Sequence, residues 1–242
     1  MDLHHLAGKL LDWIYPPQCV SCGTPGSLFC RDCRDGLQPV GDHFCSKCGK
    51  PLNKGRSCRL CRMTEFPFLA SRAPYIYDGP AAALIKKLKY EGCLDLVPIL
   101  SNLLYDFWKE LGWDADLIIP VPLSEKRRAQ RGFNQSEMIG RSFSKKVGIP
   151  IKPGALMKIR HTAQQVGLNA EERRENLNGA FAAEKVMVQG KRILLLDDVM
   201  TTGSTFAECS AVLLDAGAGS VVCLSVATTS DDHGSPNMLN SV

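Results

Sequence analysis

The most informative apolar stretch of the chain is a run of four branched residues, Ile193 to Leu196. A short run that is apolar without interruption predicts a strand buried on both faces, as in a parallel sheet. Further on, Phe206, Cys209 and Leu213 recur at helical spacing, and Gly217 follows where a helix would end. The pattern therefore predicts a buried strand, a loop and a helix in succession.

Apolar positions in the rest of the chain alternate between strand-like and helix-like spacing. We expect an amphipathic helix over residues 4–15, a strand over 73–77, helices over 80–89 and 94–111, and another strand over 117–119. Helical and strand patterns continue to alternate from there toward the end of the chain. This alternation predicts an α/β fold with a parallel sheet.

Length and composition leave room for a second, smaller module. A chain of 242 residues with 45% hydrophobic and 22% charged residues can bury a full α/β core and carry an accessory domain. No apolar run approaches the roughly twenty residues that span a bilayer, and the N-terminus lacks a cleavable apolar core. We therefore expect a cytoplasmic protein without membrane insertion.

The loop after the buried strand has the chemistry of a phosphate site. Hydroxyl side chains and Gly203 precede a helix, whose N-terminal N–H groups favour an anion such as a phosphate monoester. The adjacent carboxylates of Asp197 and Asp198 accept hydrogen bonds and suit a vicinal diol or the waters of Mg²⁺. Phosphate beside diol indicates a ribose 5-phosphate, whereas the simpler alternative is an acidic strand end followed by a helix cap.

Eight of the eleven cysteines form four Cys-x-x-Cys pairs, a spacing that turns two sulfurs toward one tetrahedral ion. Two structural Zn²⁺ sites are therefore expected, in the simplest arrangement with consecutive pairs sharing an ion and otherwise with alternate pairs cross-braced. Disulfides, a redox pair and iron–sulfur ligation are the competing interpretations. The expected ligands are Cys19, Cys22, Cys30 and Cys33 for one ion, and Cys45, Cys48, Cys58 and Cys61 for the other.

The acidic pair and the loop together resemble the phosphoribosyl pyrophosphate (PRPP) signature of type I phosphoribosyltransferases. The resemblance implies that Asp197 and Asp198 hold the ribose hydroxyls of PRPP, that the loop holds the 5-phosphate, and that Mg²⁺ accompanies PRPP. The residues implied to bind PRPP are Asp197, Asp198, Val199, Met200, Thr201, Thr202, Gly203, Ser204 and Thr205.

Positive charge is concentrated in one segment, although the net charge of the chain is only +4. Ten Lys or Arg residues and two acids lie between Glu125 and Arg160, so the segment favours a polyanion, either PRPP or nucleic acid, unless it is a solvated face. Its densest part follows a predicted strand end and precedes Gly132. We expect a mobile loop there, in which Arg128 and Arg131 act catalytically by closing over the pyrophosphate.

Further segments narrow the resemblance to one family. Residues 88–92 (LKYEG), 120–122 (PVP), 131–135 (RGFNQ) and 165–181, together with the PRPP string and the cysteine module, are similar to the ComF family of competence-associated proteins, which includes GntX-type members. The resemblance covers roughly Cys19 to Thr229. The further residues implied to contact the substrate are Lys89, Pro122, Asn134, Gln135 and Gln165.

The resemblance implies a type I phosphoribosyltransferase fold with a zinc-ribbon-like module over residues 1–66 and a transferase-like domain over 67–229. Residues 230–242 lie outside the resemblance, and their polar composition with Gly234 and Pro236 predicts a disordered tail. The resemblance also implies glycosyl transfer from PRPP, in the handling of internalised single-stranded DNA during natural transformation, with that DNA and competence proteins as partners. The alternative is a PRPP or nucleotide sensor, or a nucleic-acid-binding adaptor, without turnover.

Overall fold

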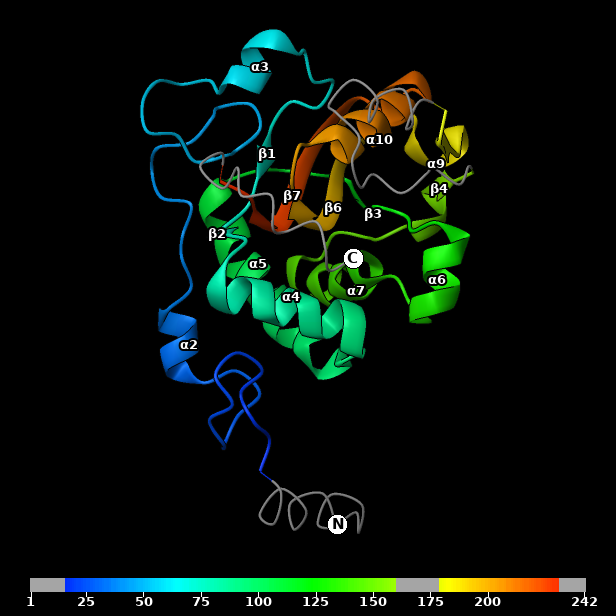
Figure 1. Ribbon diagram of the computed structural model, residues 1–242. Coiled ribbons are helices and arrows are strands. Elements are labelled where there is room, and N and C mark those ends of the chain that lie inside the picture. Colours follow the sequence, from blue (N-terminus) through cyan, green and yellow to red (C-terminus); the bar gives the residue numbers. More distant parts are fainter. Residues whose placement is uncertain (1–15, 160–178, 231–242) are drawn as a thin grey trace.

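The computed structural model describes residues 16–159 and 179–230, and its centre is a five-stranded parallel sheet (Figure 1). The strand order is β1–β7–β6–β3, and β2 also pairs with β7. The strands are β1 (Ser71–Arg72), β2 (Tyr75–Ile76), β3 (Leu117–Pro120), β6 (Arg192–Met200) and β7 (Ser220–Thr228). The predicted parallel α/β fold is confirmed.

Helices cover both faces of this sheet and divide its core into two hydrophobic clusters. On one face lie α4 (Gly79–Glu91), the 3₁₀ turn η1 (Leu94–Leu96), α5 (Val97–Leu111) and α7 (Gln135–Val147), and on the other lies α10 (Ser204–Asp215) (Figure 1). Shorter elements are α2 (Arg31–Asp35), α3 (Arg59–Met63), α6 (Glu125–Arg131), η2 (Pro153–Ala155) and α9 (Lys185–Val188). None of the described helices is long and apolar enough to cross a membrane.

The position of β6 in the sheet explains why its apolar run is uninterrupted. Leu194 and Leu196 face the cluster under α5 and α7, whereas Ile193 and Leu195 face the cluster under α10. All four side chains are fully buried. Because β6 is buried on both faces, it needs apolar residues at every position rather than at alternate ones.

Several elements differ from the prediction. Within the strand expected over residues 73–77 only Tyr75–Ile76 (β2) is a strand, and β1 precedes the range at Ser71–Arg72. β6 continues past the apolar run to Met200, so the acidic pair lies within the strand rather than after it. The expected mobile loop at residues 126–131 is instead helix α6, with Ser124 as its N-cap and Gly132 (φ 77°) ending it. A two-stranded antiparallel sheet, β4 (Leu156–Lys158) and β5 (Phe181–Ala183), was not anticipated.

The cysteine-rich segment contains two copies of one small unit, placed on opposite faces of the sheet. Cys19 and Cys33 belong to the cluster under α4, α5 and α7, and Cys45 and Cys58 belong to the cluster under α10. The connection between the copies runs along β2, where the Ile76 amide donates to the Gln38 carbonyl (2.8 Å). This connection covers the edge of the sheet, which would otherwise expose unpaired backbone groups.

Three predictions fall outside the described residues. They are the amphipathic helix over residues 4–15, the substrate contact of Gln165, and the tail from residue 231 onward.

Candidate functional site

Two groups of four cysteines bring their sulfurs together, and consecutive Cys-x-x-Cys pairs share a group. The groups are Cys19, Cys22, Cys30 and Cys33, and Cys45, Cys48, Cys58 and Cys61, with all ligand atoms of each group within 4.8 Å of one another. The sequential pairing predicted from the sequence is therefore confirmed for the described residues.

The sulfur geometry fits Zn²⁺. The Cys22 and Cys30 sulfurs are 3.6 Å apart, and those of Cys48 and Cys58 are 3.7 Å apart. Four sulfurs about 2.3 Å from one tetrahedral ion would be separated by about 3.8 Å, which agrees with both distances. Backbone amides support the arrangement, because the Cys58 amide donates to the Cys45 sulfur and the Cys30 amide to the Cys19 sulfur.

The thiol groups also indicate a bound cation. Burial works against ionisation of Cys45, but amide hydrogen bonds from Cys48 and Cys58 outweigh it and lower its pKa to about 6. Burial raises the pKa of Cys61 to about 12, opposed by a hydrogen bond with Cys48 and supported by interactions with Cys58 and Cys45. Four crowded thiols cannot all ionise unless a metal neutralises them, which is the behaviour of a Cys₄ zinc site.

A second site lies where β6 approaches α4 and α7, and both carboxylates of the acidic pair are held there. The Lys89 ammonium of α4 lies 2.8 Å from Asp198 Oδ1, and the Ser136 hydroxyl of α7 donates to Asp197 Oδ1 (2.7 Å). The Asp198 amide donates to the same Asp197 oxygen (2.9 Å). Residues distant in the sequence thus fix the orientation of two adjacent carboxylates.

One oxygen of this site has no partner. Asp198 is only 3% exposed, and its Oδ2 atom is buried without a hydrogen bond among the described residues. Desolvation, followed by the charge of Asp198, raises the pKa of Asp197, while the Ser136 hydroxyl and Lys89 act in the opposite direction. Burial opposes the charge on Lys89, but Asp198 outweighs it and raises the pKa of that lysine. A buried acceptor left without a donor is costly.

The hydroxyl-rich turn leads directly from β6 into α10. Gly203 (φ 80°) is the N-cap and offers no side chain, while the Ser204 amide donates to Thr202 Oγ1 (3.3 Å). The hydroxyls of Thr202 and Ser204 are 2.8 Å apart. On the far side of Gly203, a Cβ would meet the ring of Phe66 at 3.7 Å, so the turn rests on the end of the cysteine-rich segment.

Helix α6 carries the predicted arginines. Arg128 is exposed, whereas the Arg131 guanidinium lies over the Tyr90 ring (5.2 Å) and donates to Gln135 Oε1 (3.2 Å). Gln135 is itself buried and precedes Ser136, the partner of Asp197. Arg131 therefore contacts the residue next to Ser136, the partner of Asp197, whereas Arg128 makes no such contact among the described residues.

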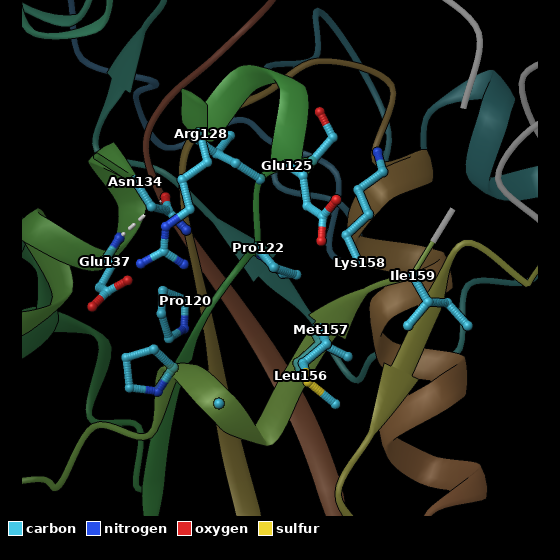
Figure 2. Close-up of a pocket in the computed structure, with 14 residues that line it drawn as sticks. Pro120, Pro122, Glu125, Arg128, Asn134, Glu137, Leu156, Met157, Lys158 and Ile159 are labelled. Carbon is cyan, nitrogen blue, oxygen red and sulfur yellow. Dashed lines mark hydrogen bonds between the residues drawn. The ribbon is translucent and has the colours of Figure 1, made fainter. Parts of the chain in front are cut away.

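A pocket of about 790 Å³ lies beside α6 and β4 (Figure 2). Figure 2 shows Arg128 and Glu125 descending from α6 toward it, with Leu156 and Met157 on the opposite side. Burial, followed by the charge of Arg127, lowers the pKa of Lys158 in its lining. Of the predicted contact residues, Pro122 and Asn134 line this pocket, whereas Lys89 forms an ion pair with Asp198.

Sequence reasoning found the acidic pair, the hydroxyl turn and the eight cysteines but missed two partners. Ser136 was not among the predicted site residues, and the N-cap of its helix is Asn134, which accepts hydrogen bonds from the Ser136 and Glu137 amides. Arg72, which donates to the Ser46 carbonyl within the second cysteine group, has no sequence feature that predicts this contact. A serine in the first turn of a helix and a lone arginine on a short strand have no distinctive local pattern.

The parallel sheet, the acidic pair on β6, the hydroxyl turn before α10 and the two cysteine groups define an α/β protein with a metal-binding module. Residues 10–62 match the family model described as "Double zinc ribbon domain", which shows that the two Cys₄ groups are zinc-binding sites. The chain belongs to the ComF family, as its relatives show.

The chain is 30% identical over 210 residues to "Competence protein F" of Haemophilus influenzae, covering 78% of this chain and 91% of the relative. It is 33% identical over 216 residues to "DNA utilization protein YhgH" of Escherichia coli O157:H7, covering 85% and 94%. "Competence protein ComFC" of Bacillus subtilis is 24% identical and is covered to 80%, as is this chain.

Solved structures give lower similarities. A glutamine PRPP amidotransferase from B. subtilis has a TM-score of 0.38 and 22% identity, covering 53% of this chain and 26% of that one. An adenine phosphoribosyltransferase from Trypanosoma brucei has a TM-score of 0.37 and 14% identity, covering 69% and 76%. Similarities of this size carry no argument about site or substrate.

Proposed function

We propose that the chain is a phosphoribosyltransferase that binds PRPP at the end of β6. The observation that carries the proposal is the buried, unpartnered Oδ2 atom of Asp198, held beside Lys89 and adjacent to Asp197. A ribose hydroxyl would satisfy that acceptor, and the neighbouring turn at the N-terminus of α10 would receive the 5-phosphate. The two features follow each other directly along the chain, because β6 ends at Met200 and α10 begins at Ser204.

In this proposal the protein positions its substrate and stabilises the leaving group. Lys89 and Ser136 orient the two carboxylates, the residues from Thr201 to Thr205 bind the 5-phosphate, and Arg128 and Arg131 approach the pyrophosphate from α6. The C1–oxygen bond to pyrophosphate breaks as an acceptor nucleophile bonds to C1. Mg²⁺ suits the oxygen donors of Asp197 and of the substrate, and when bound it would neutralise charge on the leaving group.

The test removes the two charges and keeps the shapes. We expect the double substitution Asp197→Asn and Asp198→Asn to weaken PRPP binding at least tenfold, about 1.4 kcal/mol, by calorimetry with Mg²⁺. The matched control is Asp114→Asn with Asp116→Asn, a second acidic pair, which binds Arg192 at the opposite end of β6. PRPP affinity that is unchanged in the first variant, or equally reduced in the control, would contradict the proposal.

The relatives' names, which refer to competence and DNA utilization, support a setting in DNA handling, and within it we propose the handling of internalised single-stranded DNA. The exposed cations of α6 favour a second candidate function, an adaptor that binds nucleic acid without turnover. Lys126, Arg127 and Arg128 are all exposed on one short helix. A phosphate backbone would neutralise these charges, and its binding would therefore weaken with salt.

Arg128→Ala separates the two functions, because Arg128 approaches the pyrophosphate in the transferase and is one of the exposed cations in the adaptor. The transferase predicts lower turnover or PRPP affinity, with DNA affinity and its salt dependence nearly unchanged. The adaptor predicts that the slope of log K against log salt falls by about 0.7 for single-stranded DNA, with PRPP binding intact. Pyrophosphate release from PRPP and DNA titrations at several salt concentrations provide the two measurements.

A further inference from the structure

The second zinc site lies against an arginine that belongs to the sheet rather than to the cysteine-rich segment. Arg72 is on β1, where it pairs with Leu224 of β7. Its guanidinium donates to the Ser46 carbonyl (3.0 Å) and to the Ser71 carbonyl (2.7 Å). Ser46 lies between the ligands Cys45 and Cys48, so the arginine bonds directly to the turn that presents both sulfurs.

Aromatic rings hold this guanidinium in place. Its central carbon lies 4.6 Å from the centroid of the Phe44 ring and 5.9 Å from that of Trp113. Cation–π contacts of this kind favour the charged group and restrict its orientation. Arg72 is consequently a fixed positive charge rather than a flexible surface side chain.

The backbone of β1 also packs on the same turn. The Ser71 amide donates to the Lys47 carbonyl (2.8 Å), and a Cβ at Gly49 would collide with the Ser71 carbonyl. Gly49 has φ 73°, which a glycine adopts without strain. The backbone of the turn from Cys45 to Gly49 is thus in direct contact with the backbone of β1.

Four thiolates around one Zn²⁺ leave a net negative charge, which is costly where the cysteines are buried. Cys45, Cys48 and Cys58 are each at most 3% exposed. We propose that Arg72 is the positioning residue and counter-charge of the second zinc site, so that the sheet itself completes this site. Among the described residues, no arginine makes comparable contacts with the first cysteine group.

The proposal predicts a site-specific change in zinc release. In the zinc-loaded full chain, excess chelator should remove the two ions in separate phases, and Cys22→Ser should accelerate the phase of the first site. Arg72→Met should accelerate release from the second site by about ten- to hundredfold, because partners of metal ligands typically contribute that much. Arg72→Lys keeps the charge but not the paired hydrogen bonds, so we expect a smaller acceleration.

The control is Arg62→Ala, since Arg62 follows the ligand Cys61 and donates to the Ser57 carbonyl (3.0 Å) but is exposed. We expect its zinc release to match that of the unaltered protein. An unchanged second-site rate in Arg72→Met, or equal acceleration in Arg62→Ala, would overturn the proposal. If Arg72→Met does not fold, Arg72→Lys decides alone, and equal acceleration of both phases, or of neither, overturns it.

Discussion

The two zinc ribbons are copies of one unit in unequal surroundings. In each copy the amide of the third cysteine donates to the sulfur of the first, and a glycine with positive φ follows the second cysteine. The first copy leaves Cys22 exposed, whereas the second buries three of its cysteines in the core that it shares with β6 and α10. The same Cys-x-x-Cys-Gly pattern thus produces one metal site with an exposed ligand and another that is more deeply buried.

The deeper burial of the second ribbon indicates that it supports the candidate PRPP site. Its last aromatic residues, Phe66 and Phe68, stack with ring centroids 5.0 Å apart, and Phe66 lies beside Gly203 of the hydroxyl turn. The first ribbon instead meets the N-terminal end of α4, where Gly36 approaches the Pro80 ring. Metal loss should therefore have different consequences at the two sites.

The largest effect is expected from removing ligands. Cys45→Ser with Cys48→Ser should cost much of the about 10–16 kcal/mol of zinc binding and also disrupt the core under α10. Cys19→Ser with Cys22→Ser should unfold only the first ribbon. Thermal unfolding and PRPP titration would separate the two results, because only the second-site variant should lose PRPP binding. Equal loss in both variants would contradict the comparison.

A smaller effect is expected from a matched pair of glycine substitutions. Gly23→Ala places a side chain at φ 79° in open space and should cost about 1 kcal/mol of backbone strain. Gly49→Ala adds a collision with the Ser71 carbonyl to a similar strain, at φ 73°, and should cost about 2–3 kcal/mol. Denaturant unfolding provides the measurement. Similar costs for the two substitutions would show that the contact with β1 is loose.

The smallest expected effect is a difference in acid sensitivity. Protons compete with zinc for thiolates, so metal binding weakens as the pH falls. Amide hydrogen bonds outweigh burial and lower the pKa of both Cys19 and Cys45 to about 6, so this feature alone does not separate the sites. We expect the buried second site, with Arg72 beside it, to keep zinc to a lower pH. Release of the second ion first during acid titration would contradict this expectation.

The sequence predicted those features that depend on neighbouring residues. Cys-x-x-Cys spacing predicted both metal sites, and the uninterrupted apolar run of β6 predicted a strand buried on both faces. The spacing of Phe206, Cys209 and Leu213 predicted α10, whose N-terminus follows the hydroxyl turn. Each of these patterns spans only a few neighbouring residues, because its spacing reflects the geometry of one turn, strand or helix.

Local reasoning failed where several backbone solutions were open. The polar, cationic residues 126–131 were expected to form a loop, but Ser124 caps a helix there and Gly132 ends it. Arg and Lys are good helix formers, and a charged surface helix carries no apolar stripe to reveal it. The sequence also did not show that the acidic pair lies within β6, because only the structure shows that β6 pairs with β7 as far as Met200.

Partners between distant segments were decided by the tertiary structure alone. Lys89 reaches Asp198 from α4, Ser136 reaches Asp197 from α7, and Arg72 reaches the second cysteine turn from β1. The sequence determined which groups could bind a metal, a phosphate or a diol, because those abilities belong to residue types and short spacings. Which groups meet depends on the packing of helices on the parallel sheet, since that packing brings distant segments within hydrogen-bonding distance.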